Sequence, residues 1–242
     1  MMIGFSISSI LYGGAVALGQ TDIKKIIAYS SVGHMGFVTL GIFLLNIHGS
    51  QGSLFQMLNH GITTGALFMM VGAVYERSHS REVSDNLGLG KYLPVFMGFW
   101  GILAFSSFAF PGTNNFVGEF LVFTGAFERN LLIAALTIPG ALLAAAYMLR
   151  LTQKMAWGEP ASAKGWKDLS IREWTSLLPF VFLVLYIGLA PTLFFKVMNP
   201  ALNHLLAGFK TRDPVTEIST AVKPERLIIA AGKKENQERQ GQ

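Results

Sequence analysis

The sequence predicts an all-α membrane protein, a bundle of about six transmembrane helices with one helix broken near Pro111-Gly112. Hydrophobic residues make up 51% of the 242 residues and charged residues only 14%, whereas about a quarter of a soluble domain is charged. Mean hydropathy is +0.45. The net charge of +5 comes mainly from basic residues between apolar runs. Membrane topology explains this pattern better than a nucleic-acid partner does.

Six apolar runs reach the length of about 20 residues that crosses a hydrocarbon core. We expect spans over residues 1–18, 23–45, 52–74, 93–127, 131–156 and 174–198, which form a transmembrane domain over residues 1–208. Residues 209–242 are rich in charge and predict a solvated C-terminal tail. No basic segment precedes the first run, so we expect a span there and not a cleaved signal.

The fourth run is too long to be one straight span. As a single helix, residues 93–127 would measure roughly 50 Å, against a hydrocarbon thickness of about 30 Å. Pro111 and Gly112 lie in its middle and break helices. We therefore predict two half-helices joined by an unwound hinge inside the membrane, a feature that marks ion sites in transporters.

The distribution of Lys and Arg predicts the orientation. One set of loops is basic, and the opposite short loops carry little positive charge apart from Arg129. By the positive-inside rule the basic loops face the cytoplasm and both termini lie on the outer side. The basic set is Lys24, Lys25, Arg77, Arg81, Lys91, Arg150, Lys154, Lys164, Lys167 and Arg172.

Glu119 is the sharpest functional signal, because it follows the predicted break inside an apolar run. An ionisable residue at that depth costs at least about 2.5–3.5 kcal/mol and therefore needs a partner. Buried carboxyl groups in general exchange protons closer to neutral pH than exposed ones do. The alternative is a Glu near the end of a span that reaches the interface.

Two histidines lie at membrane depth on consecutive predicted spans, His34 on the second and His60 on the third. Imidazole is a natural proton relay near neutral pH. The alternative is that both are structural residues with satisfied hydrogen bonds. Lys24 and Lys25 open the second span, and for Lys25 we favour a lysine that extends toward the interface.

Other chemistries find no support in the sequence. It contains no cysteine and lacks the nucleotide-binding, hydrolase and zinc-protease motifs. No ligand spacing for haem, iron–sulfur or zinc occurs. We expect no cofactor, metal or catalytic residue in this chain.

Four motifs in order over about 100 residues resemble the antiporter-like subunits of respiratory complex I, in particular the subunit M family, the bacterial counterpart of mitochondrial subunit 4. The motifs are Gln20-Thr21-Asp22-Ile23-Lys24-Lys25 leading to Ser30-Ser31-Val32-Gly33-His34-Met35-Gly36, then Asn59-His60-Gly61, Tyr75-Glu76-Arg77-Ser78-His79-Ser80-Arg81, and Pro111-Gly112-Thr113 leading to Phe116-Val117-Gly118-Glu119-Phe120.

The resemblance implies a role for each matched residue. His34 and His60 would belong to the central hydrophilic axis, Lys24 would be the lysine of the Asp-x-Lys pattern, and Glu119 would be the acid on a broken helix at the outward end of the proton path. Two positions depart from the family pattern. Asn59 stands where Ala is usual, and Asn114 replaces a Gly. Both are polar, which would alter hydration of the path.

The resemblance covers only the last six helices of the family fold. It implies a chain that is the C-terminal half of a proton-translocating subunit of an NADH:quinone oxidoreductase in a bacterial inner (plasma) membrane. A second polypeptide would supply the missing N-terminal half, unless the chain is a fragment. Neighbouring antiporter-like subunits and lipid would be the other partners. FMN, iron–sulfur clusters and quinone would belong to other subunits.

Two other hypotheses stay open. The same motifs occur in multi-subunit cation/proton antiporters and in membrane-bound hydrogenases. A structural half-subunit that conducts no protons is the third possibility, and a neutral substitution of Glu119 would distinguish it.

Overall fold

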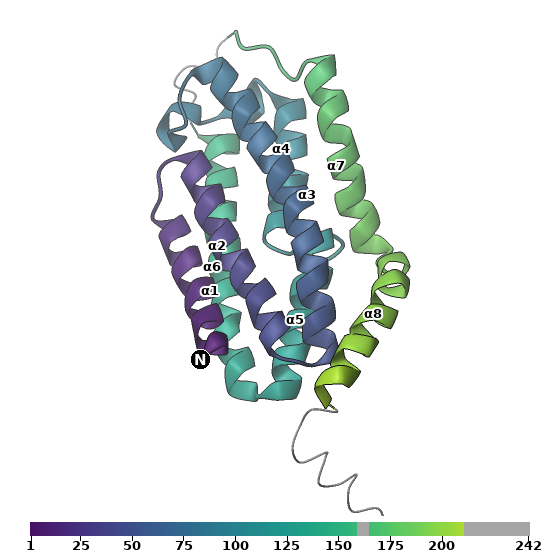
Figure 1. The fold of residues 1–242 in the computed structure, drawn as a ribbon. Helices are drawn as coiled ribbons and strands as arrows, with labels where there is room; N and C mark the ends of the chain where they lie inside the picture. Colours follow the sequence, from purple (N-terminus) through teal and green to yellow (C-terminus); the bar gives the residue numbers. More distant parts are fainter. Residues whose placement is uncertain (159–164, 211–242) are drawn as a thin grey trace, which may run out of the picture. The chain divides into compact units, whose positions relative to one another are not determined.

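The computed structural model describes residues 1–158 and 165–210, and this part of the chain is helical with no β-strand. Its elements are α1 (Met2–Leu18), α2 (Ile23–Phe43), α3 (Ile47–Ser78), η1 (Val83–Asn86), η2 (Leu89–Lys91), α4 (Pro94–Ser107), α5 (Asn114–Arg129), α6 (Leu131–Trp157), α7 (Ile171–Leu189) and α8 (Thr192–Lys210) (Figure 1). The chain forms two compact units, Met1–Asn199 and Pro200–Gln242, and the helices α1 to α7 belong to the first. Lys164 and residues 211–242 of the predicted tail lie outside the described residues.

The predicted class, a polytopic helical membrane bundle, is confirmed. Within the described residues, α2, α3, α6 and α7 are each long and apolar enough to cross a membrane. The count reaches five if η1–η2 and α4, a pair bent by 111°, form one span. It stays below the predicted six because α1 has 17 residues, and because α4 and α5 have 14 and 16 residues and are separate helices.

At two positions the helix ends differ from the ends of the predicted spans. The third span was expected to start at residue 52, but Asn46 accepts a hydrogen bond from Gly49 N and caps a helix that begins at Ile47. The sixth span was expected to reach residue 198, but α7 ends at Leu189. Pro191 disfavours a helical Ala190, whose φ and ψ are −128° and 59°.

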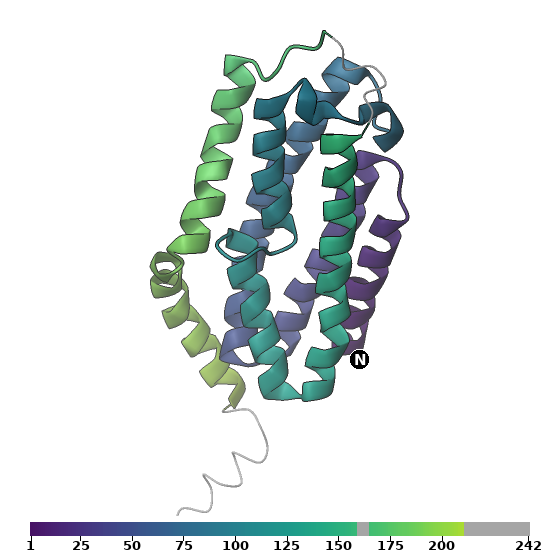
Figure 2. The same ribbon diagram turned by 180° about the vertical axis from the view of Figure 1, so that it is seen from behind.

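The predicted break in the fourth apolar run is present. Helices α4 and α5 follow each other along the bundle with an irregular segment between them (Figure 2). Gly112 has a φ of +93°, which favours glycine, and Ala109 also has a positive φ of 58°. The freed backbone groups find partners within the segment, since Phe110 N donates to Phe105 O and Thr113 N to Phe110 O. Pro111 and Gly112 therefore form the hinge.

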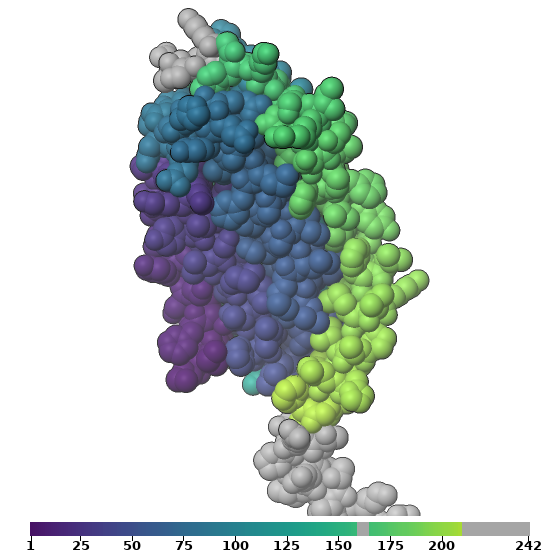
Figure 3. Space-filling view, turned by 45° about the horizontal axis from the view of Figure 1, so that its top comes forward, coloured from purple at the N-terminus to yellow at the C-terminus, as the bar shows by residue number. Residues whose placement is uncertain are grey.

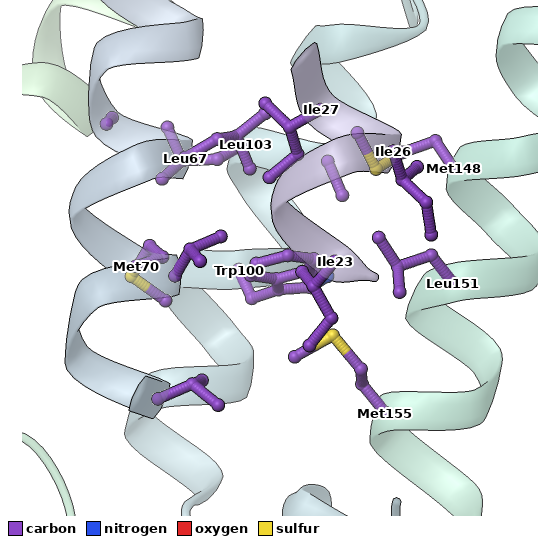
Figure 4. Packing of buried hydrophobic residues seen from close by; sticks show 14 of the residues in the cluster. Ile23, Ile26, Ile27, Leu67, Met70, Trp100, Leu103, Met148, Leu151 and Met155 are labelled. Carbon is purple, nitrogen blue, oxygen red and sulfur yellow. The ribbon is translucent and has the colours of Figure 1, made fainter. Parts of the chain in front are cut away.

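The main apolar core lies where α2, α3, α4 and α6 meet (Figure 4). Ile23 and Ile27 of α2, Met70 of α3, Trp100 of α4 and Met155 of α6 are all fully buried in it. Burial of such side chains contributes roughly 1.5–3 kcal/mol each where the alternative is exposure to water. This core packs the four helices together at the end of the bundle where the basic loops lie.

Polar contacts hold this basic end together. The turn between α1 and α2 pairs with the start of η1, because Ile23 N donates to Arg81 O and Val83 N to Thr21 O. The carboxylate of Asp168 accepts hydrogen bonds from Val95 N and Phe96 N and so caps α4. On the surface, the η1–η2 region (blue) separates the ends of α1 and α2 (purple) from the start of α7 (green) (Figure 3).

Arg77 joins the end of α3 to the start of α7. Its guanidinium makes a bidentate ion pair with Glu173 at 2.8 and 2.9 Å and also donates to the carbonyl groups of Ala73, Lys167 and Asp168. Glu173 completes a capping box with Ser170. The pair is largely buried, with side-chain exposures of 15% and 19%.

We predict that Arg77→Gln destabilises the assembled protein, because Glu173 and three carbonyl groups lose a charged donor. Hydrogen bonds to charged groups contribute about 1.5–3 kcal/mol each, so the melting temperature should fall clearly. Arg81→Gln is the control, because Arg81 is half exposed and lies 3.7 Å from Asp22. An equal effect of the two substitutions in a thermal-shift measurement would contradict the assignment.

Candidate functional site

The most buried contact between an acidic and a basic side chain in the described bundle joins α2 and α5. His34 Nδ1 lies 2.9 Å from Glu119 Oε1, and the two residues are 3% and 2% exposed. Glu119 lies one turn after the start of α5, and His34 lies midway along α2. The partner that an acid inside an apolar run requires is therefore a histidine.

Gln56 of α3 gives Glu119 a second partner, because Gln56 Nε2 donates to Glu119 Oε1 at 3.1 Å. This contact requires a close approach of α3 and α5. A Cβ at Gly118 would collide with the side chain and backbone of Gln56, and one at Gly52 would collide with Gly118 O and Val122 N. Small residues at such positions let membrane helices approach closely.

His60 lies beside His34. The two ring centroids are 5.4 Å apart, and the rings are tilted by 44°. His60 Nδ1 lies 3.1 Å from Thr64 Oγ1, one turn further along α3. The structure thus brings three of the predicted proton-transfer residues together: His34, His60 and Glu119.

Lys24 is separate from this cluster. Its side chain is exposed and lines a surface pocket with Phe68, Tyr75 and Arg81. It precedes His34 by ten positions on one helix, which is about 15 Å. Asp22, the acid of the same motif, caps α2 by accepting a hydrogen bond from Lys25 N.

The two residues that depart from the family pattern contact each other. Asn59 Nδ2 donates to Asn114 O at 2.8 Å, and Asn114 Nδ2 lies 3.4 Å from Asn59 O. Asn114 Oδ1 accepts from Ser106 Oγ at 2.6 Å and from Thr63 Oγ1 at 3.3 Å. This network ties α3 and the end of α4 to the first residue of α5, and it fixes the helix that carries Glu119.

Three amide oxygens close to this network are buried without a hydrogen-bond partner: Gln56 Oε1, Asn59 Oδ1 and Asn115 Oδ1. Their residues are at most 1% exposed. Such groups in a native interior call for an explanation, of which bound water is the usual one. These oxygens give water between α3 and α5 hydrogen-bond acceptors close to Glu119.

Tyr147 and Gln56 belong to the cluster although the sequence analysis did not single them out. Tyr147 OH lies 3.5 Å from His34 Nε2, so His34 has a polar neighbour at each ring nitrogen. Gln56 could have been found by spacing, because Gln56, Asn59 and Thr63 share one helical face. Tyr147 could not, since an aromatic residue in an apolar run usually packs in the core.

Comparisons with known proteins identify the family of this chain. Residues 1–144 match the family described as "NADH:quinone oxidoreductase/Mrp antiporter", transmembrane region. The chain belongs to this family. It is 40% identical over 210 residues to NADH-quinone oxidoreductase subunit M of Rickettsia bellii, which covers 86% of this chain and 42% of that protein. It is 41% identical over 203 residues to NADH-ubiquinone oxidoreductase chain 4 of Marchantia polymorpha, covering 83% and 41%.

Several solved structures share the fold. A chain of respiratory complex I from Thermus thermophilus superposes with a TM-score of 0.81 at 33% identity, covering 85% of this chain and 44% of that one. A chain of the membrane-bound sulfane sulfur reductase, an archaeal respiratory membrane complex, gives 0.77 at 27% identity, covering 85% and 42%. A chain of the Mrp complex from Dietzia gives 0.76 at 20% identity, covering 91% and 48%, which shows the fold alone. The chain spans about two fifths of the length of the curated relatives it matches.

We predict that Asn114→Ala destabilises the protein more than Asn115→Ala. Both substitutions remove the same buried volume, but only the first leaves the hydroxyl groups of Ser106 and Thr63 without their shared acceptor. Loss of such partners costs about 1–3 kcal/mol. Melting temperatures of the purified assembly measure the difference, and a larger effect at Asn115 would exclude the network as the stabilising element.

Proposed function

We propose that this chain is the C-terminal half of a proton-translocating membrane subunit of an NADH:quinone oxidoreductase-type complex. The observation that carries the proposal is the buried contact between His34 and Glu119, in a chain whose relatives are named as subunits of that enzyme. Redox chemistry with FMN, iron–sulfur clusters and quinone takes place in other subunits. This chain moves protons.

The geometry allows one proton to be shared between two groups. When Glu119 is ionised, His34 Nδ1–H donates to Oε1, and when Glu119 is protonated, its hydroxyl donates to an unprotonated Nδ1. The 2.9 Å separation fits either arrangement. A change of charge in a neighbouring subunit shifts the balance between the two states, because electrostatic interactions are strong where water is excluded.

His60 and the unpartnered amide oxygens extend the pair toward the rest of the bundle. In this proposal His60 and bound water connect His34 with the central axis, and Glu119 releases its proton toward the end of α5. That end lies opposite the basic loops, because α5 runs away from the break (Figure 1). With the basic loops at the cytoplasm, the proton leaves on the outer side of the bacterial inner membrane.

A second polypeptide or a further part of the same protein supplies the remaining helices of the subunit. Neighbouring antiporter-like subunits and lipid cover the exposed apolar side chains of α6 and α7, among them Leu142, Phe182 and Leu189. A cation/proton antiporter component or a membrane-bound hydrogenase arm is the alternative. The peripheral subunits that co-purify with the chain distinguish this alternative from the proposed function.

We predict that Glu119→Gln lowers proton uptake into sealed vesicles by about tenfold or more, as expected for loss of a group that transfers the proton. Quinone reduction either continues uncoupled or falls together with pumping. Glu128→Gln on the same helix is the matched control, because Glu128 is 44% exposed and pairs with the exposed His48. Unchanged pumping in Glu119→Gln would favour a structural half-subunit.

A further inference from the structure

A pocket of about 560 Å³ opens at the basic end of the bundle. The turn after α1, the first residues of η1 and the last turns of α6 form its walls. Its rim is exposed and polar, with Glu82, Arg150 and Lys154 among the residues that line it. Its deeper walls are buried and apolar, and they are formed by Ala17, Ile26 and Leu151.

Tyr147 is the polar residue at the inner end of this pocket. It lines the pocket and is only 4% exposed, and it precedes Lys154 at the rim by two helical turns, or about 10 Å. Its hydroxyl lies 3.5 Å from His34 Nε2, the ring nitrogen that faces away from Glu119. A surface pocket thus reaches a tyrosine whose hydroxyl group contacts the proposed proton-transfer pair.

A second cavity of about 10 Å³ lies next to this contact. Ser30, His34 and Tyr147 line it together with apolar residues of α1, α2 and α6. This volume is at the lower limit for one water molecule, and the three side chains provide the two to four polar partners that such a water needs. A water molecule in this cavity could therefore bridge the 3.5 Å contact between Tyr147 OH and His34 Nε2.

We propose that this pocket is an aqueous access path from the basic end of the bundle to His34, with Tyr147 as the proton-transfer residue at its inner end. This inference rests on the proposed function. It adds a residue and a route that lie wholly within the described part of this chain. Water in the pocket is held at the polar rim and at Tyr147, while the apolar walls between them offer no hydrogen bonds.

The proton balance is simple. A protonated water in the pocket, supplied from the bulk, delivers a proton to the Tyr147 oxygen as the Tyr147 hydroxyl proton passes to His34 Nε2, so neutral water remains and the tyrosine ends unchanged. The imidazolium of His34 then passes its Nδ1 proton to the Glu119 carboxylate and is left neutral with a proton on Nε2. After Glu119 has released its proton, water takes the Nε2 proton of His34 and returns one to Nδ1, which restores the first tautomer and completes the cycle.

Cysteine labelling tests whether the pocket admits water, because the chain contains no native cysteine. We expect Leu151→Cys, in the intact complex in sealed vesicles with the basic end outward, to react with a charged, membrane-impermeant methanethiosulfonate. Met148→Cys on the same helix is the control, because Met148 is fully buried and does not line the pocket. Equal, slow labelling at the two positions would overturn the access path. The same result is expected if a lipid or another subunit fills the pocket, and it would overturn the path in that case too.

Proton uptake tests the role of Tyr147. We expect Tyr147→Phe to lower uptake by about tenfold or more, and Tyr186→Phe, at an exposed site on α7, to leave it unchanged. Labelling of Leu151→Cys should persist in the Tyr147→Phe background. A collapse of the pocket would abolish this labelling. If Glu119→Gln lowers uptake and Tyr147→Phe does not, the route through Tyr147 is wrong and the proposed function stands. If neither lowers uptake, both fail.

Discussion

A carboxyl group inside an apolar span must have polar partners, and the arrangement of α2, α3 and α5 follows from that requirement. Glu119 is 2% exposed, and His34 and Gln56 reach one of its oxygens from two different helices. A buried charge without a partner costs several kcal/mol, so these helices cannot separate or shift in register without a large penalty. The same contact that satisfies the acid places a second titratable group against it.

The break between α4 and α5 is the second part of this arrangement. It starts α5 at Asn114, whose side chain is held by Ser106 and Thr63, and it leaves Glu119 in the first turns of a new helix. Gly188 of α7 packs directly on the backbone of Gly112 and Thr113, where a Cβ would collide. Helix α7 therefore covers one side of the hinge, while Pro111 itself is exposed.

The sequence predicted the class of fold, the break at Pro111-Gly112 and a buried Glu119 with a partner, because each depends on a local signal: apolar length, helix breakers, or charge in an apolar run. The functional role of Glu119 stays a prediction. It could not predict the extent of α3, which depends on the cap at Asn46, or the place of Tyr147 beside His34, which depends on how α6 packs against α2. Lys24 shows the limit of motif matching, because it belongs to the same motif as His34 but is exposed, about 15 Å away along the helix. Packing between distant segments decided the place of Tyr147.

The central claim is that a proton moves between His34 and Glu119 while the complex works. Infrared difference spectroscopy of the intact complex, with the Glu119 carboxyl band assigned by its absence in Glu119→Gln, measures this directly. The account predicts that the band changes when electrons are supplied, and that the change is lost in His34→Asn although Glu119 is still present. A Glu119 band that stays the same with and without electron supply would contradict it.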